Sequence, residues 1–369
     1  MLSAVCGRDA LHEAVHTVGR GVSGRSTQPV QNNIYLSAHA DHLRLVATDL
    51  EFISLEASIP ATETEQGAIT VPARFFQEVT SNLPEADVAL KEIESNGLSV
   101  QCARSRYQIR GMAAEDFEML PPLADASTFE VEQALLRDVI RQTRIAVSTD
   151  ETRPTLTGAL LSLQPNLLEV VATDTHRLGL RRAAIDQPNA QRRDAIVSAR
   201  ALTEVERILH AEAEIPAKVA VSDNQIEFTI GTVKIGSRLI EGQFPDYQKV
   251  VPENCDKRLT VNTRELEAAL RRSVIVARED AYRITLDAEM DLLKVSAESP
   301  DVGVVVEEIE AELEGDQVTV AFNSRYLLDA IAVITAEKVH LELSGPLNPG
   351  MLRPAGGADY TYVLMPMQK

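Results

Sequence analysis

The sequence predicts an α+β protein made of three copies of one domain, each with two helices packed on antiparallel sheets. The first indication is a phrase that recurs three times: "LRLVATDLEFISLEASI" from Leu43, "LEVVATDTHRLGLRRAAI" from Leu168 and "LKVSAESPDVGVVVEEIE" from Leu293. The alanines at its centre, Ala47, Ala172 and Ala297, stand 125 residues apart each time. A second landmark, "VPARFF", "VSARAL" and "FNSRYL", follows at nearly the same spacing. Two landmarks that keep step over such an offset indicate duplicated structure.

The elements within each copy follow from the period of its apolar residues. The recurring phrase has apolar residues at every second position, as a strand requires. Other alternating segments with turn residues between them, such as "NQIEFTIGTVKIGS", bring each copy to roughly eight short strands. Apolar residues at three- and four-residue steps indicate helices. Helices are expected over residues 7–20, 72–82, 134–147, 199–210, 262–277 and 323–334.

The domain boundaries are expected where this periodicity stops. A chain of 369 residues exceeds what one hydrophobic core normally serves. Proline and polar residues replace the pattern near Pro121 and Val251. We therefore predict domains over residues 1–124, 125–252 and 253–369.

Composition narrows the class of protein. Hydrophobic residues make up 44% and charged residues 25%, which is an ordinary globular balance. The three widely spaced cysteines argue against a disulfide framework and for a reducing compartment. The chain shows no secretory signal pattern and no apolar run long enough to span a membrane. We expect a cytoplasmic protein that uses neither a metal nor a cofactor.

The charges are distributed unevenly. The formal net charge is −19, which by itself argues against a nucleic-acid partner. The six helix windows, however, hold twelve arginines, no lysine and nine acids, so they carry +3 and the remainder −22. Spacings of three, four and seven place sets of these arginines on one helix face. Helices that face a common centre would give a basic lining suited to a phosphate backbone. A solvated face with ion pairs inside each helix is the alternative.

Two sequence patterns suggest an enzyme instead. "HEAVH", which contains His12 and His16, matches the zinc-protease motif H-E-x-x-H. The extended form of that motif needs a third histidine where Val22 stands. Asp174 and His176 could act as acid and base, but the first copy lacks the histidine and no serine elbow or cysteine partner is evident. We therefore expect no catalytic site.

Three segments resemble the bacterial sliding clamp, the β subunit of DNA polymerase III: "ATDTHRL", "EGQFPDYQKVVP" and the terminal "YVLMPMQK". The resemblance covers the whole chain in order. It implies the DNA clamp fold and a homodimer of head-to-tail chains that form a closed ring around double-stranded DNA. It also implies that the ring tethers the replicative DNA polymerase, the clamp loader and repair polymerases at the nucleoid, without catalysis of its own. A ring-shaped scaffold that does not hold DNA is the rival with the same fold.

The resemblance also implies a pocket for a short apolar peptide of these partners. Thr175 departs from the family, which commonly has glycine there, and the terminal Gln368 and Lys369 differ from many relatives. Matched residue by residue, the pocket consists of Leu156, Thr173, His176, Arg177, Leu178, Pro245, Val250, Val363, Met365, Pro366 and Met367.

DNA contacts and the ring seam are assigned from the resemblance and from the arginine faces. The match to the family indicates Arg25 and Arg74 as DNA-binding residues. The arginine faces add Arg137, Arg141, Arg200, Arg271 and Arg325. At the seam, the apolar residues Tyr107 and Ile109 of one chain are expected against Ile275 and Val276 of the other. The basic "RSR" at Arg104 and the acidic run after Val306 would add charge complementarity there.

Overall fold

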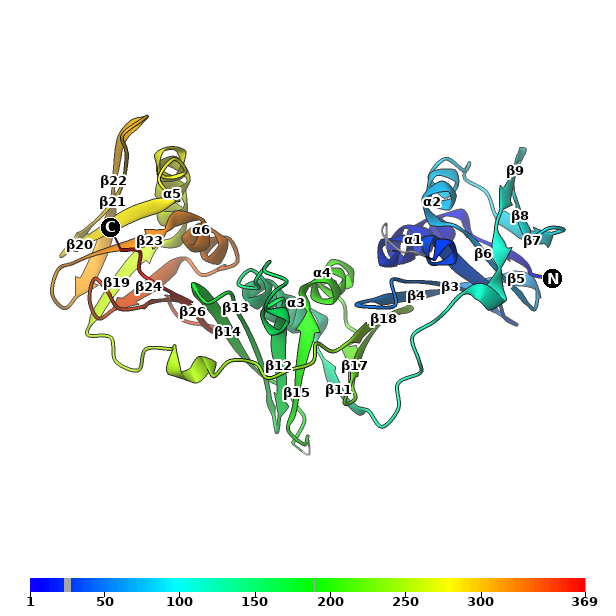
Figure 1. Cartoon of the computed structure of the whole chain (residues 1–369), viewed down its shortest axis with the longest axis horizontal. Helices are drawn as coiled ribbons and strands as arrows, with labels where there is room; N and C mark the ends of the chain where they lie inside the picture. Colours follow the sequence, from blue (N-terminus) through cyan, green and yellow to red (C-terminus); the bar gives the residue numbers. More distant parts are fainter. Residues whose placement is uncertain (23–27, 189, 369) are drawn as a thin grey trace. The chain divides into compact units, whose positions relative to one another are not determined.

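The computed structural model describes residues 1–22, 28–188 and 190–368. It divides into two compact units, and Figure 1 follows the chain through both. Unit 1 combines Met1–Gln133 with Arg200–Leu239, and unit 2 combines Ala134–Ala199 with Ile240–Lys369. The central part of the chain therefore contributes to both units. The predicted boundaries at residues 124 and 252 stay a prediction.

All six predicted helices are confirmed, although the predicted windows overrun most of their C-terminal ends. Asn262 and Asn323 begin two of the helices as N-caps, because their side chains accept hydrogen bonds from backbone N–H groups of the first turn. The helices are α1 (Arg8–Val18), α2 (Ala73–Ser81), α3 (Gln133–Arg144), α4 (Ala199–Ile208), α5 (Thr263–Ala277) and α6 (Ser324–Ala332).

Unit 1 contains two antiparallel sheets. The five-stranded sheet has the order β5 (Thr62–Glu65), β1 (Ser3–Cys6), β7 (Val88–Ile93), β8 (Gly97–Cys102) and β9 (Ser105–Arg110). The nine-stranded sheet has the order β10 (Met112–Ala113), β6 (Gly67–Pro72), β2 (Asn33–Ala38), β3 (His42–Thr48), β4 (Ser54–Pro60), β18 (Val233–Arg238), β17 (Gln225–Ile230), β16 (Ala217–Val221) and β11 (Ser127–Val131).

Unit 2 contains one antiparallel sheet of twelve strands. Its order is β15 (Arg193–Ser198), β12 (Gly158–Gln164), β13 (Leu167–Thr173), β14 (Arg177–Ala184), β26 (Asp359–Leu364), β25 (Gly350–Pro354), β24 (Lys338–Leu343), β19 (Lys257–Asn262), β22 (Gly303–Glu314), β21 (Leu292–Ser299), β20 (Arg283–Glu289) and β23 (Val318–Asn323).

The threefold repeat is confirmed in the order of these elements. The second and third copies, β11 to β18 and β19 to β26, each run strand, helix, four strands, helix, three strands. The first copy has the same order with two short additions, β5 and β10. The last strand of one copy pairs with a strand of the preceding copy, and the strand that is paired occupies the equivalent place each time: β18 pairs with β4, and β26 pairs with β14.

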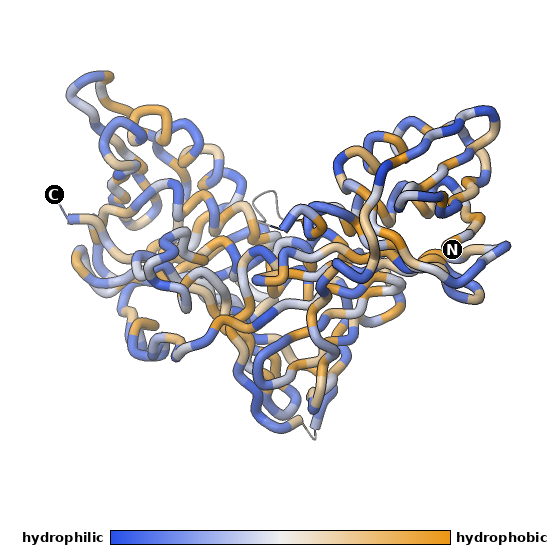
Figure 2. The backbone as a smooth tube through the Cα atoms, turned by 45° about the vertical axis from the view of Figure 1, so that its right-hand side comes forward, coloured by the Kyte–Doolittle hydropathy of each residue, from blue (hydrophilic) through white to orange (hydrophobic). Residues whose placement is uncertain are grey.

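Alternating burial explains why these segments form sheets. Along β4, Leu55, Ala57 and Ile59 are buried, while the residues between them are half-buried. Figure 2 shows the same interleaving of apolar and polar residues along the backbone. Helix α1 buries Leu11, Val15 and Val18, at the three- and four-residue spacing that the sequence shows.

Candidate functional site: a pocket beside the repeated turn

The recurring "ATD" forms a hairpin turn after β3 in the first copy and after β13 in the second. Asp174 Oδ1 accepts hydrogen bonds from the backbone N–H groups of His176 (2.9 Å) and Arg177 (3.0 Å). The Thr173 hydroxyl donates to the Arg177 carbonyl at 2.7 Å. Thr48 and Asp49 make the equivalent bonds in the first copy. The threonine and the aspartate are thus needed for the turn itself, which explains why the phrase occurs twice.

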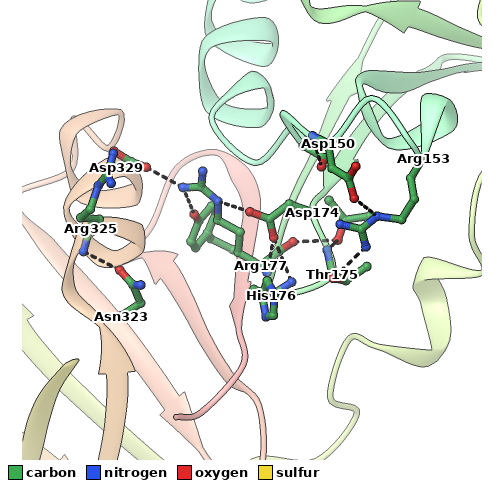
Figure 3. A network of polar contacts seen from close by, with 12 residues as sticks. Asp150, Arg153, Asp174, Thr175, His176, Arg177, Asn323, Arg325 and Asp329 are labelled. Carbon is green, nitrogen blue, oxygen red and sulfur yellow. Dashed lines mark hydrogen bonds and ion pairs between the residues drawn. The ribbon is translucent and has the colours of Figure 1, made fainter. Parts of the chain in front are cut away.

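In the second copy, the turn ends on an arginine that reaches two other elements. Arg177 Nε lies 2.9 Å from Asp174 Oδ2, and Nη1 lies 2.5 Å from Asp329 Oδ2 on α6. Its guanidinium also stacks 4.2 Å from the ring centroid of Tyr326 and donates to the Tyr362 hydroxyl. Figure 3 shows Arg177 held between the two carboxylates. Burial opposes the charge, but Tyr362 and the two carboxylates outweigh it and raise the pKa of Arg177.

A pocket of about 140 Å³ opens beside this turn in unit 2. Most of the atoms that line it are apolar, and its polar side chains already have partners within the protein. It is lined by Thr173, Thr175, Arg177, Leu178, Pro245, Tyr247, Val250, Val363 and Met365. Because apolar walls favour apolar ligands, the pocket can take a small apolar group such as an aliphatic or aromatic side chain.

Seven of the eleven predicted pocket residues line this pocket: Thr173, Arg177, Leu178, Pro245, Val250, Val363 and Met365. The remaining four are not among its lining residues. Leu156 is buried, and His176 is exposed. Pro366 and Met367 belong to the terminal segment, which is tied down at both ends because Met365 N donates to the His176 carbonyl and Met367 N to the Ala321 carbonyl.

Sequence reasoning missed two lining residues, Thr175 and Tyr247. Tyr247 lies in the segment "EGQFPDYQKVVP", which carries the resemblance, but it is not among the residues predicted to line the pocket. Thr175 was noticed only as a departure from glycine. Arg153 Nη1 donates to the Thr175 hydroxyl at 3.3 Å and is itself paired with Asp150, as Figure 3 shows. Arg153 is therefore a further candidate for the pocket rim.

The predicted DNA-binding arginines differ in how free their charge is. Arg137 and Arg325 are exposed, and Arg325 lies 4.9 Å from the ring centroid of Tyr282. The other four that the structure describes form ion pairs with carboxylates: Arg74 with Glu78, Arg141 with Asp138, Arg200 with Asp49 and Arg271 with Glu267. In three of these pairs, both partners lie on the same helix, as the alternative of a solvated helix face predicts. Arg25 falls outside the described residues.

The predicted seam residues are not equally available. The Ile275 side chain is 61% exposed on α5, and Tyr107 and Val276 are half-buried. Ile109 on β9 is only 2% exposed, which corrects the expectation that it offers an apolar side chain to another chain. Its side chain is enclosed because alternate residues of β9 face the core of its own unit.

The enzyme-like patterns have a simpler structural explanation. His12 and His16 lie on α1 with ring centroids 6.3 Å apart. Over residues 1–22, 28–188 and 190–368, no group of three or more His, Cys, Asp or Glu side chains is placed to hold a metal ion. In the same ranges, no helix is both long and apolar enough to cross a membrane. Asp174 is occupied by its turn and by Arg177.

Comparisons with known proteins agree with this architecture. Family models of the N-terminal, central and C-terminal domains of the DNA polymerase III β subunit match residues 2–121, 130–246 and 248–368. The β sliding clamp of Staphylococcus aureus is 31% identical over 378 residues, with both chains covered in full. The sliding clamp of Pseudomonas aeruginosa, solved bound to griselimycin, superposes with a TM-score of 0.95 at 31% identity over both whole chains. The clamp of Bacillus subtilis superposes with a TM-score of 0.95 at 29% identity, over 100% of this chain and 99% of its own. The chain belongs to the family of bacterial sliding clamps, the β subunits of DNA polymerase III.

Proposed function

We propose that two copies of this chain close head to tail into a ring around double-stranded DNA. The ring would tether the replicative DNA polymerase, the clamp loader and repair polymerases to the duplex at the nucleoid. The protein itself would catalyse no step. A closed ring needs no strong contact to stay on DNA. Processivity would come from this topology.

The observation that carries the proposal is a pair of sheet edges. Strand β4 of the first copy pairs with β18, and β14 of the second pairs with β26. The strand of the third copy that is equivalent to β4 and β14 is β22. The strand of the first copy that is equivalent to β18 and β26 is β9. In the described part of the chain, β9 ends its sheet and no strand pairs with the outer edge of residues 303–310. A second copy would therefore supply the missing partner for each edge.

The side chains at the two edges are complementary. Val304, Val306 and Ile275 are 65%, 56% and 61% exposed around the β22 edge. The β22 strand also carries the acidic run that includes Glu308, and β9 lies in the basic segment that begins at Arg104. Because β9 and β22 are different surfaces, the contact is heterologous, and it forms a closed ring when two copies complete it twice.

The helix arginines support the DNA partner. Arg137 and Arg325 are exposed, and Arg74 is 94% exposed at its side chain despite its pair with Glu78. We assign DNA contact to these and to Arg25, Arg141, Arg200 and Arg271. The last three keep part of their surface free beside their ion pairs. Contacts to phosphates alone predict binding that ignores sequence and weakens steeply with salt.

The pocket beside the "ATD" turn is the proposed site for partner peptides. Its apolar walls suit a short peptide with leucine or phenylalanine side chains, and methionine at its edge adapts to several partners. The eleven predicted residues stay assigned to this site: seven in the walls, and Leu156, His176, Pro366 and Met367 around them.

Retention on circular DNA tests the ring. We expect protein loaded by a bacterial clamp loader onto nicked circular plasmid to stay bound at moderate salt in gel filtration. It should be lost once a restriction enzyme linearises the same plasmid, because a ring slides off free ends. Equal retention on both forms would contradict encirclement. Loss from both forms would favour the rival scaffold that does not hold DNA.

A further inference from the structure

Glu169 is a buried carboxylate next to the pocket but not in its lining. It lies on β13 and is only 4% exposed. It accepts hydrogen bonds from the Tyr247 hydroxyl and, at 2.6 Å, from Arg182 Nε on the neighbouring strand. A buried charge is costly unless it is paired, and replacing a whole buried ion pair with apolar residues is often neutral or stabilising. A carboxylate at this position therefore calls for a reason other than stability.

Its partner Tyr247 belongs to the less regular wall of the pocket. Residues 239–256, between β18 and β19, contain no strand and only the short 3₁₀ helix Tyr247–Lys249. Tyr247 is nevertheless largely buried, with only 9% of it exposed, and its ring packs in a cluster that includes Leu160, Leu178 and Val363. The wall is thus a loop held by side-chain contacts.

The hydroxyl of Tyr247 fixes where this loop sits. Backbone bonds hold the loop at Ile240, which donates to the Ile196 carbonyl, and the Ser344 hydroxyl binds the Asn254 carbonyl near the other end. The bond to Glu169 lies between these two points. Burial, followed by the hydrogen bond to Glu169, raises the pKa of Tyr247 to about 12, so the phenol remains a donor at neutral pH.

We infer that Glu169 is a positioning residue of the peptide pocket. It holds Tyr247, and with it Pro245 and Val250, in the position that an apolar peptide needs before the peptide arrives. A wall that is already in place spares the ordering cost of binding. This inference rests on the proposed function of the pocket.

The test compares variants that break the bond from either side. Tyr247→Phe keeps the ring in the core and removes only the hydroxyl, and Glu169→Ala removes the acceptor. We expect each to weaken the binding of a fluorescein-labelled pentapeptide ending in leucine and phenylalanine about tenfold, in the range of one hydrogen bond to a charged group. The double variant should bind no more weakly than either single variant, because all three lose the same bond.

Rescue separates positioning from general destabilisation. Glu169→Gln keeps an acceptor for the Tyr247 hydroxyl, so it should restore binding to within about threefold of the wild type. The matched control is Glu56→Ala, which removes a carboxylate paired with Arg44 at 2.7 Å in the nine-stranded sheet of unit 1. It should leave peptide affinity unchanged. Fluorescence anisotropy gives the affinities, and thermal unfolding reports how stable each variant is.

The outcomes are distinct. Wild-type affinity in Tyr247→Phe, or additive losses in the double variant, would overturn the positioning role while leaving the pocket intact. A wild-type protein that does not bind the peptide would overturn both the pocket assignment and this inference. Tyr247→Phe keeps its ring, so it decides the question even where Glu169→Ala does not fold.

Discussion

At the scale of single residues, the turn beside the pocket carries backbone strain. Thr175 has φ of 81°, in the left-handed region that β-branched residues seldom adopt. Leu50 occupies the equivalent place in the first copy with φ of 63°. The turn needs this conformation because the Thr173 hydroxyl accepts from the backbone N–H of Thr175 and the Asp174 carboxylate accepts from that of His176. The strain is therefore a consequence of the turn's hydrogen bonds.

Replacing Thr175 with glycine should relieve that strain. Left-handed backbone costs a residue with a Cβ about 1–2 kcal/mol, and the lost bond to Arg153 and the greater freedom of the unfolded chain offset part of the gain. We expect Thr175→Gly to raise the free energy of unfolding by about 0.5–1 kcal/mol in urea titrations. Leu50→Gly is the matched variant and should act in the same direction. A lower urea midpoint in both variants would show that the turn is unstrained.

At the scale of elements, the same turn connects successive copies twice. In unit 1, Asp49 pairs with Arg200 at the start of α4, and Arg20 pairs with Glu204 one turn later at 2.6 Å. In unit 2, the turn at Asp174 reaches α6 through Arg177 and Asp329. Each connection joins the turn of one copy to the second helix of the next. Arg200, which is predicted to contact DNA, thus also joins the first and second copies of the repeated domain within the chain.

Removing the charge of Asp49 tests this connection. Asp49→Asn keeps an oxygen for the turn's backbone N–H groups but weakens the pair with Arg200. Asp49 is nearly buried and Arg200 is 39% exposed, so solvent screens the pair in part. We expect a loss of about 1–2 kcal/mol in unfolding free energy, below that of a fully buried pair. A double-mutant cycle with Arg200→Ala measures the coupling, and a coupling energy near zero would mean that the pair does not stabilise the junction between the first and second copies of the repeat.

At the scale of the whole molecule, the proposed ring requires a dimer. The chain has a mass of 40.4 kDa, so sedimentation should give twice that value for the wild type. Ile275→Asp places a charge in the apolar seam beside the acidic β22, and the desolvation of that charge should shift the protein to the monomer. The control is Ile215→Asp, at a position outside β9 and β22 that is 68% exposed, and this variant should stay dimeric. A monomeric wild type, or a dimeric Ile275→Asp, would contradict the seam.

Local pattern was sufficient for the repeat and the helices, and the resemblance to sliding clamps supplied most of the pocket residues. Helical and strand periods depend on residues a few positions apart, so α1 and β4 could be predicted from their own sequences. Apart from Leu156, the predicted pocket residues lie in the three segments that carry the resemblance, and those segments supplied lining residues as far apart as Thr173 and Val363.

By itself, the sequence determined the threefold repeat, the α+β class and the segments that form the site. Only the tertiary structure decided that Ile109 faces inward, that Arg200 is paired with Asp49, and that Glu169 holds Tyr247 at the pocket wall. The partners in the last two contacts are 151 and 78 residues apart. Such contacts depend on which sheets and loops meet after folding, and the period of a single segment carries no information about its distant neighbours.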